Sequence, residues 1–245
     1  MRRVLRRLLP AVLVVPLVSG AAPAAPTFDL RGSAERTKAG GSARFSLSVA
    51  ATLAGASVRT SENGTVSFTR RLAHVYKLVP GRPIPEELIL DGPFTYTNAN
   101  VQAALANPAV RPWTKLDVRR LPRAQRRRVD DLDHVRALAY LGEGVVGATR
   151  VGAGHVRGTV EPARVLARVP RSERAAIRVA IRSDYAAGPF RADFWLDAHE
   201  RIRRVHVAYR TARGGRIVVD GRLSSFGVAV DVKPPPASEI EDISP

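Results

Sequence analysis

Apolar and polar residues alternate along much of the chain, and this period of two predicts strands with one buried face. The first alternating run begins at Ser42 and places Phe45 on its apolar side. A second run covers residues 65–79. The Asn63-Gly64 pair between the two runs predicts a hairpin turn, because both residues tolerate the backbone conformation of tight turns.

Further alternating segments recur to the C-terminus, separated by turns rich in glycine and proline. Residues 142–147 fit the G-x-G-x-x-G pattern of dinucleotide-binding turns, but alternating residues follow where such a site needs a helix. We therefore interpret this stretch as part of a hairpin and expect no cofactor. The further predicted strands are 87–90, 94–98, 113–118, 148–151, 155–160, 190–196, 202–210, 216–226 and 228–232.

The period changes to that of a helix in two places. Residues 122–140 carry apolar side chains at helical spacing, among them Leu132 and Val135, opposite a charged face. A second helical zone covers residues 161–182. The order of strands, helix, hairpin, helix and strands predicts an α+β fold in which helices pack on one face of a large antiparallel sheet.

The first residues have the features of an export signal. Four arginines precede an apolar run at residues 8–18, and the small residues at 22–24 offer a cleavage site. The apolar run is too short to span a bilayer as a permanent helix. We predict a signal peptide over 1–24, a linker over 25–41, one domain over 42–236 and an acidic tail over 237–245.

Composition narrows the range of partners. The 245 residues carry a formal net charge of +17, and loss of the signal removes four positive charges. The remaining charge favours anionic surfaces such as membranes, wall polymers or nucleic acid, and export argues against nucleic acid. The chain has no cysteine, which excludes zinc-thiolate sites and cysteine nucleophiles.

No group of side chains has a spacing typical of catalysis. The five histidines lack metal-ligand spacing, and no G-x-S-x-G motif is present. We therefore expect no metal and no enzymatic activity. Arg126, Arg127 and Arg128 are typical of a solvated helix face, and contact with lipid headgroups is the alternative.

Five motifs follow one another along residues 42–236: W-x-x-L-D at 113–117, L-G-E-G-V-V-G-A-T at 141–149, F-W-L-D at 194–197, I-R-R-V at 202–205 and S-S-F-G-V-A-V-D-V at 224–232. Together they resemble the mycobacterial-type LppX/LprG lipoproteins of the actinobacterial envelope, which are relatives of the periplasmic lipoprotein carrier LolA. The order of the motifs is more specific than any single one of them.

The resemblance implies a strongly curved antiparallel sheet, or half-open barrel, with helices packed on its concave face. It also implies an apolar cavity that receives acyl chains, in a carrier that performs no reaction. The predicted concave face and helix stripe, taken as the lipid-binding cavity, carry Phe45, Leu47, Val49, Val66, Phe68, Leu72, Tyr76, Leu90, Phe94, Trp113, Leu132 and Val135.

Two interpretations of that face stay open, because alternation does not distinguish a packed core from a lipid-sized hollow. The first is an exported, monomeric lipid carrier whose arginines meet an anionic membrane surface. The alternative is a cationic envelope binding module with a filled core, docked on wall polymer or a protein partner. Family members carry a lipidated cysteine after the signal, but Ala21 stands there. We therefore expect a protein of the cell envelope, or a secreted one, without a lipid anchor.

Overall fold

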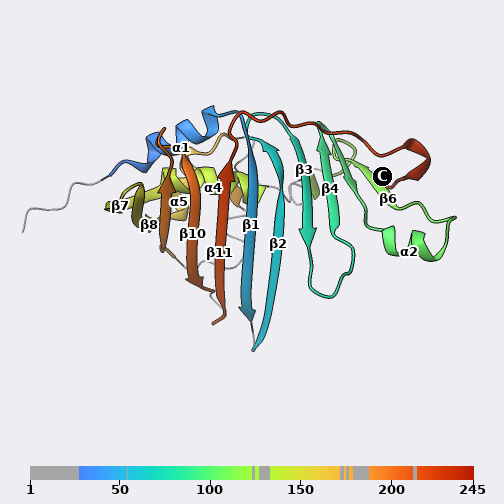
Figure 1. Ribbon diagram of the computed structural model, residues 1–245, viewed down its shortest axis with the longest axis horizontal. Helices are drawn as coiled ribbons and strands as arrows, with labels where there is room; N and C mark the ends of the chain where they lie inside the picture. Colours follow the sequence, from blue (N-terminus) through green and yellow to red (C-terminus); the bar gives the residue numbers. More distant parts are fainter. Residues whose placement is uncertain are drawn as a thin grey trace, which may run out of the picture.

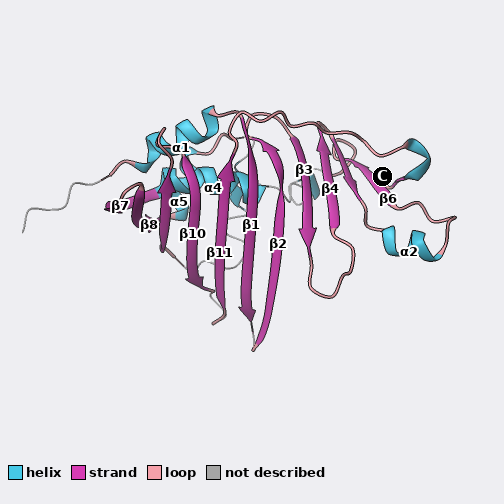
Figure 2. Cartoon of the chain, in the orientation of Figure 1, coloured by secondary structure: helices cyan, strands magenta, loops and turns pink. Residues whose placement is uncertain are grey.

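Twelve strands form one open, curved sheet in a computed structural model of the chain (Figures 1 and 2). The structure describes residues 28–53, 55–122, 125–126, 133–171, 174, 177–178, 188–211 and 214–245. The strand order is β12-β6-β5-β4-β3-β2-β1-β11-β10-β9-β8-β7, so the sheet has two edges and does not close. Every neighbouring pair is antiparallel except β12 with β6. The predicted α+β fold, a half-open barrel, is confirmed.

The predicted strands 190–196, 202–210 and 216–226 match the observed strands most closely. Their bounds are β1 (Ser42–Leu53), β2 (Ala56–Ser67), β3 (Leu72–Leu78), β4 (Glu86–Asp91), β5 (Phe94–Thr97), β6 (Trp113–Asp117), β7 (Val145–Gly152), β8 (His155–Val160), β9 (Phe190–Leu196), β10 (Ile202–Arg210), β11 (Arg216–Ser224) and β12 (Ile240–Asp242).

Helices cover one face of this sheet, which we call the inner face, defined as the face that carries Phe45. Figure 1 shows α4 (Asp133–Leu141) and α5 (Pro162–Arg168) behind the strands, while the short α2 (Val101–Ala106) lies at the β6 end. A close contact between helix and sheet lies at Gly221 of β11, where an added Cβ would be 2.4 Å from Cδ1 of Leu138. The absence of a side chain there lets α4 press directly on the sheet.

The segment predicted as a linker contains a helix instead, α1 (Leu30–Ala39). Asp29 caps its N-terminus by accepting a hydrogen bond from the Arg31 amide at 2.9 Å. Thr37 is fully buried, and its hydroxyl accepts the Ile202 amide of β10 at 2.8 Å. The linker prediction is therefore wrong for residues 30–39, because burial of Leu30 and Ala34 together with this hydrogen bond docks a largely polar helix.

The hairpin predicted at Asn63-Gly64 is also wrong. β1 and β2 stay paired as far as Leu53 with Ala56, and Gly64 lies in mid-strand opposite Phe45. A Cβ on Gly64 would lie 2.0 Å from the carbonyl oxygen of His74 in β3. This glycine therefore serves the close approach of two strands rather than a turn.

The second predicted run, residues 65–79, is interrupted by a bend at residues 68–71 that separates β2 from β3. The interruption shifts the alternation by one position. In β3, Ala73 and Val75 point to the inner face and are buried, whereas Tyr76 points outward and is 40% exposed. Such a one-residue shift moves every following side chain to the opposite face.

The C-terminal segment also departs from the prediction. Residues 228–232, predicted as a strand, form none, and the chain runs across the upper ends of the strands in Figure 1 to the far edge. There β12 pairs in parallel with β6, from Ile240 opposite Trp113 to Asp242 opposite Lys115. The predicted acidic tail, residues 237–245, therefore contributes an edge strand to the sheet.

Two other expectations are met. Residues 142–144 form a single short 3₁₀ turn before the β7–β8 hairpin, so the glycine motif opens no helix. Both predicted helical zones contain helices, although residues 123–124, 127–132 and most of 172–187 lie outside the described residues. Within the described part of the chain, no helix is long and apolar enough to cross a membrane.

Candidate functional site

The inner face of the central strands is a continuous apolar surface. Cross-strand register places Phe45 opposite Leu223, Leu47 opposite Gly221, and Val49 opposite Val219. At the level of Phe45 and Leu47 the surface is buried beneath the helices. This part of the inner face is a packed core.

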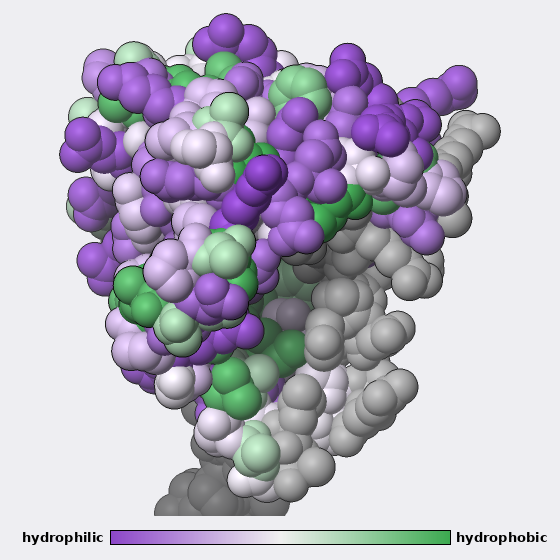
Figure 3. Space-filling view, turned by 90° about the vertical axis from the view of Figure 1, so that its right-hand side faces the viewer, coloured by the Kyte–Doolittle hydropathy of each residue, from purple (hydrophilic) through white to green (hydrophobic). Residues whose placement is uncertain are grey.

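Farther along the same strands the apolar surface continues with less cover. Four inner-face residues there are packed against the core but only half-buried: Val49, Phe190, Tyr209 and Val219. Figure 3, which views the molecule from the β6 side, shows a hollow with hydrophobic side chains on its wall. The inner face therefore divides into a buried core and a partly open apolar surface.

A row of charged residues crosses the inner face of β2, β3 and β4. Glu62 lies opposite Leu47 of β1, Lys77 lies opposite Glu62, and Glu86 lies opposite Lys77. All three charged residues are half-buried. They bound the apolar surface on the side of β2 to β4. The predicted cavity face did not include them, because it was read from apolar residues alone.

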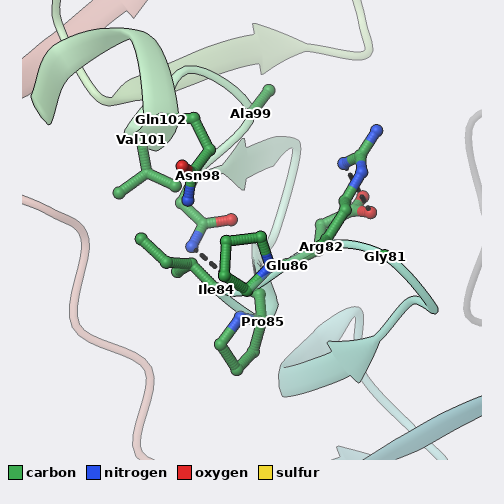
Figure 4. Close-up of a pocket in the computed structure, with 10 residues that line it drawn as sticks. Gly81, Arg82, Ile84, Pro85, Glu86, Asn98, Ala99, Val101 and Gln102 are labelled. Carbon is green, nitrogen blue, oxygen red and sulfur yellow. Dashed lines mark hydrogen bonds and ion pairs between the residues drawn. The ribbon is translucent and has the colours of Figure 1, made fainter. Parts of the chain in front are cut away.

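A small pocket lies beyond this row, between the β3–β4 loop and the start of α2 (Figure 4). Its volume is about 340 Å³, and Ile84, Pro85 and Val101 supply its apolar wall. The amide of Asn98 donates to the Pro85 carbonyl at 3.0 Å and accepts from the Glu87 amide at 2.7 Å. Because both ends of this side chain hold the loop in place, its role in the pocket is structural.

The outer face carries a network of charges centred on two aspartates. Asp220 lies 2.5 Å from a guanidinium nitrogen of Arg204 and 3.7 Å from one of Arg222. Asp193 accepts from His155 at 2.7 Å and from Arg157 at 2.9 Å. Burial by itself would raise the pKa of each aspartate, but these hydrogen bonds and charges lower it below the usual value.

The ring of Trp195 completes this network. The His155 ring stacks on it at 4.6 Å, and the Arg204 guanidinium lies 4.4 Å from its centre. Both faces of the indole are therefore occupied by neighbouring side chains. Aspartates whose pKa is lowered by neighbouring cationic side chains in this way are typical of a structural ion-pair network rather than of acid-base catalysis.

The structure brings together about half of the residues predicted for the cavity. Phe45, Leu47, Val66, Phe68, Leu90 and Val135 are buried in the main core, and Val49 is packed against it. Leu132 lies outside the described residues.

Four predicted cavity residues lie on the outer face, so their predicted placement is wrong. Leu72 pairs with Asp91, and Asp91 pairs with Phe94, so all three lie on the outer face. Tyr76 lies four residues after Leu72 on β3 and shares its face. Trp113 lies four residues before Asp117, the partner of Phe94, and shares that face. The one-residue shift at the bend after β2 places Leu72 and Tyr76 of β3 on the outer face. On β5 and β6 the inward positions are held by Thr95, Thr97, Thr114 and Leu116, and the large aromatic residues point the other way.

The arginines predicted to contact headgroups are only partly described. Arg126 is exposed, and its Nε donates to the Leu121 carbonyl at 2.7 Å. A second nitrogen of the same guanidinium donates to the Arg119 carbonyl. Two of its three guanidinium nitrogens therefore already donate to backbone oxygens. Arg127 and Arg128 lie outside the described residues. Among the described residues, no group of three or more histidines and carboxylates could hold a metal ion.

Comparison with known proteins gives likenesses of fold. No protein-family model matches the chain, and no curated protein matches it. Lipoprotein LppX of Mycobacterium tuberculosis is 13% identical with a TM-score of 0.47, and the match covers 83% of this chain and 98% of LppX. An uncharacterized conserved protein from Thermus thermophilus is 11% identical with a TM-score of 0.39, and the match covers 85% of this chain and 95% of that protein.

A LolA superfamily protein from Nitrosomonas europaea is 8% identical with a TM-score of 0.31, and the match covers 86% of this chain and 97% of that protein. At such identities the likeness is one of fold alone. The open, curved antiparallel sheet with helices on its inner face is the fold that the motif resemblance to LppX- and LolA-type proteins implied, and it is present in this chain.

Proposed function

We propose that this chain is an exported, non-catalytic carrier that binds lipid acyl chains on the open part of its inner face. One observation carries the proposal: the apolar surface of the sheet continues past the buried core as half-buried residues. Figure 3 shows a hollow with hydrophobic side chains on its wall. A surface of this kind on a folded domain favours an apolar ligand. The motif resemblance to lipid-binding envelope proteins supports the same class of ligand.

Burial of the acyl chain supplies the affinity. Each buried CH₂ group contributes about 0.8 kcal/mol, so a chain of about twelve carbons gains roughly 10 kcal/mol. After an association cost of at least about 4 kcal/mol, longer chains still reach binding near the micromolar range. Since this term depends on area rather than on hydrogen bonds, the carrier accepts chains of differing chemistry.

The proposal predicts that a bulky residue on the open part of the inner face blocks uptake. Val49→Trp enlarges a half-buried side chain on the inner face of β1. If it displaces two CH₂ groups of the ligand, the loss is about 1.6 kcal/mol, or more than tenfold in affinity. The measurement is the dissociation constant of a fluorescent long-chain diacylglycerol.

Ala50→Trp is the matched control, since it places the same ring one residue along β1 on the outer face, opposite Val218 and Arg59. It should bind the probe as the original chain does. Absence of probe uptake by the original chain, together with absence of lipid in native mass spectra of the purified protein, would overturn the carrier proposal.

A further inference from the structure

The ends of β9 and β10 part from each other and leave a pocket between them. β9 stays paired with β8 as far as Phe190, and β10 stays paired with β11 as far as Arg210. The pairing between β9 and β10 ends earlier, at Ala192 with Val207. A pocket of about 330 Å³ opens there, lined by residues 188–191 and 208–210.

The two faces of the sheet give this pocket two kinds of wall. Phe190 and Tyr209 come from the inner face, with ring centres 5.3 Å apart, and both pack against the main core. Arg191 and Arg210 come from the outer face and are exposed. The pocket therefore joins the apolar inner surface to a cationic rim.

A third arginine adds to the charge of this rim. Arg216 of β11 lies directly opposite Arg210. Like charges in opposed positions on neighbouring strands destabilise a sheet. In the described part of the chain, none of the three arginines, Arg191 included, has a carboxylate within ion-pair distance.

A second pair of opposed arginines in this sheet has an acidic side chain beside it. Arg204 lies opposite Arg222 on the same two strands, and Asp220 lies within 2.5 Å of the first and 3.7 Å of the second. The repulsion in that pair is offset by an acidic side chain of the protein. At Arg210 and Arg216 the described residues supply no such anion, so the position is suited to an anion from outside.

We propose that the parted ends of β9 and β10 form a phosphate-binding site, in which Arg191, Arg210 and Arg216 hold a phosphate group above the Phe190 and Tyr209 rings. This inference rests on the proposed function and deepens it, since a phospholipid would place its headgroup here and its chains along the inner face. Guanidinium groups fit phosphate because parallel N–H donors match two of its oxygens. Several donors from separate strands can bind a tetrahedral group at the same time.

The test compares three probes that carry acyl chains, a phosphate group, or both. Fluorescent phosphatidylglycerol carries acyl chains and a phosphate, the matching diacylglycerol carries the chains alone, and inorganic phosphate carries the anion alone. Each is titrated into the full chain and into the variant Arg191→Gln/Arg210→Gln. The control Arg44→Gln/Arg120→Gln removes the same charge at two exposed arginines far from the pocket.

We expect the original chain to bind phosphatidylglycerol about tenfold or more tighter than diacylglycerol, which corresponds to one charge-assisted hydrogen bond. The pocket variant should lose this preference and keep its affinity for diacylglycerol, whereas the control should keep both. If the preference is absent but inorganic phosphate binds to the original chain and not to the pocket variant, the site takes free phosphate.

If the pocket variant changes neither the headgroup preference nor phosphate binding, the inference is wrong. If neither lipid binds to any of the proteins, the proposed function fails, and the inorganic phosphate titration still decides whether the anion site exists. The two failures are therefore distinguishable.

Discussion

At the scale of single residues, Gly64 shows how a position in the sheet is fixed by the approach of a neighbouring strand. Its missing side chain leaves room for the His74 carbonyl, 2.0 Å from where a Cβ would be. The obstacle is backbone of a paired strand, so it has no rotamer by which to move aside. Gly64→Ala should therefore destabilise the fold by about 1–3 kcal/mol, measured as the free energy of unfolding in urea.

Gly152→Ala is the control for this prediction. Gly152 also lies in a strand, but the nearest atom to an added Cβ is 3.8 Å away. A change within about 0.5 kcal/mol is expected there. Equal unfolding free energies for the two variants would contradict the account of Gly64 as a contact between strands.

The sequence predicts the face of some single residues correctly and the backbone role of others wrongly. Alternation placed Phe45, Leu47 and Val49 correctly, because a long regular strand fixes the face of every second side chain. The Asn63-Gly64 pair has the residues of a turn, yet long-range pairing with β1 and β3 decided its conformation. The local sequence did not show whether Gly64 makes a turn or allows two strands to approach closely.

At the scale of elements, the docking of β12 on β6 includes contacts made by Lys115 of β6 and Asp242 of β12. The Ile243 amide donates to the Lys115 carbonyl at 2.9 Å, and the Lys115 ammonium lies 3.3 Å from Asp242. Hydrogen bonds from the side chain and amide of Ser244, and the nearby Lys115, lower the pKa of Asp242 from 3.8 to about 2. The docking of this element is therefore sensitive to acid.

The direction of the pH dependence follows from that lowered pKa. A group with a lower pKa in the folded state stabilises that state above its ordinary value of 3.8, and this stabilisation is lost as the pH falls toward about 2. We expect the protection of the Ile243 amide against hydrogen exchange, corrected for intrinsic rates, to be constant above about pH 5 and to decrease below 3.8.

Asp242→Asn isolates this effect from a neighbour that titrates in the same range. Asp117 also has a pKa lowered to about 2, by the Arg119 side chain. In Asp242→Asn, Ile243 should be less protected at neutral pH and nearly independent of pH, whereas Asp117→Asn should keep the original dependence. The opposite pattern would assign the acid sensitivity to Asp117.

The inward faces of β3, β5 and β6 could not be predicted from the sequence, because strand register decides them, whereas Leu90 of β4 was placed correctly. A bend of four residues, 68–71, shifts the alternation between β2 and β3, and nothing in the apolar pattern marks the shift. Phe94 and Trp113 were placed inward because they are large, but Thr95 and Thr97 hold the inward positions of β5. Size is a weaker guide to the buried face than register.

At the scale of the whole molecule, the sheet separates two surfaces of opposite character. The inner face of β1 and of β8 to β11 is apolar, and arginines stand on the outer face of β8 to β11 in excess over Asp193 and Asp220. The carrier proposal depends on the inner face, while docking on an anionic polymer, the alternative function, depends on the outer face. Ionic strength distinguishes the two because screening acts on exposed charges and leaves apolar burial almost unchanged.

We therefore expect the affinity for diacylglycerol to change by less than about twofold between about 0.05 and 0.5 M NaCl, since the Debye length falls from roughly 14 to 4 Å without touching an uncharged ligand. Polyphosphate bound to the outer arginines should weaken by about tenfold or more over the same range. Both are measured by fluorescence titration of the full chain. Tight, salt-sensitive polyphosphate binding by a chain that takes up no diacylglycerol would favour the binding module, because the outer face alone would then account for all recognition.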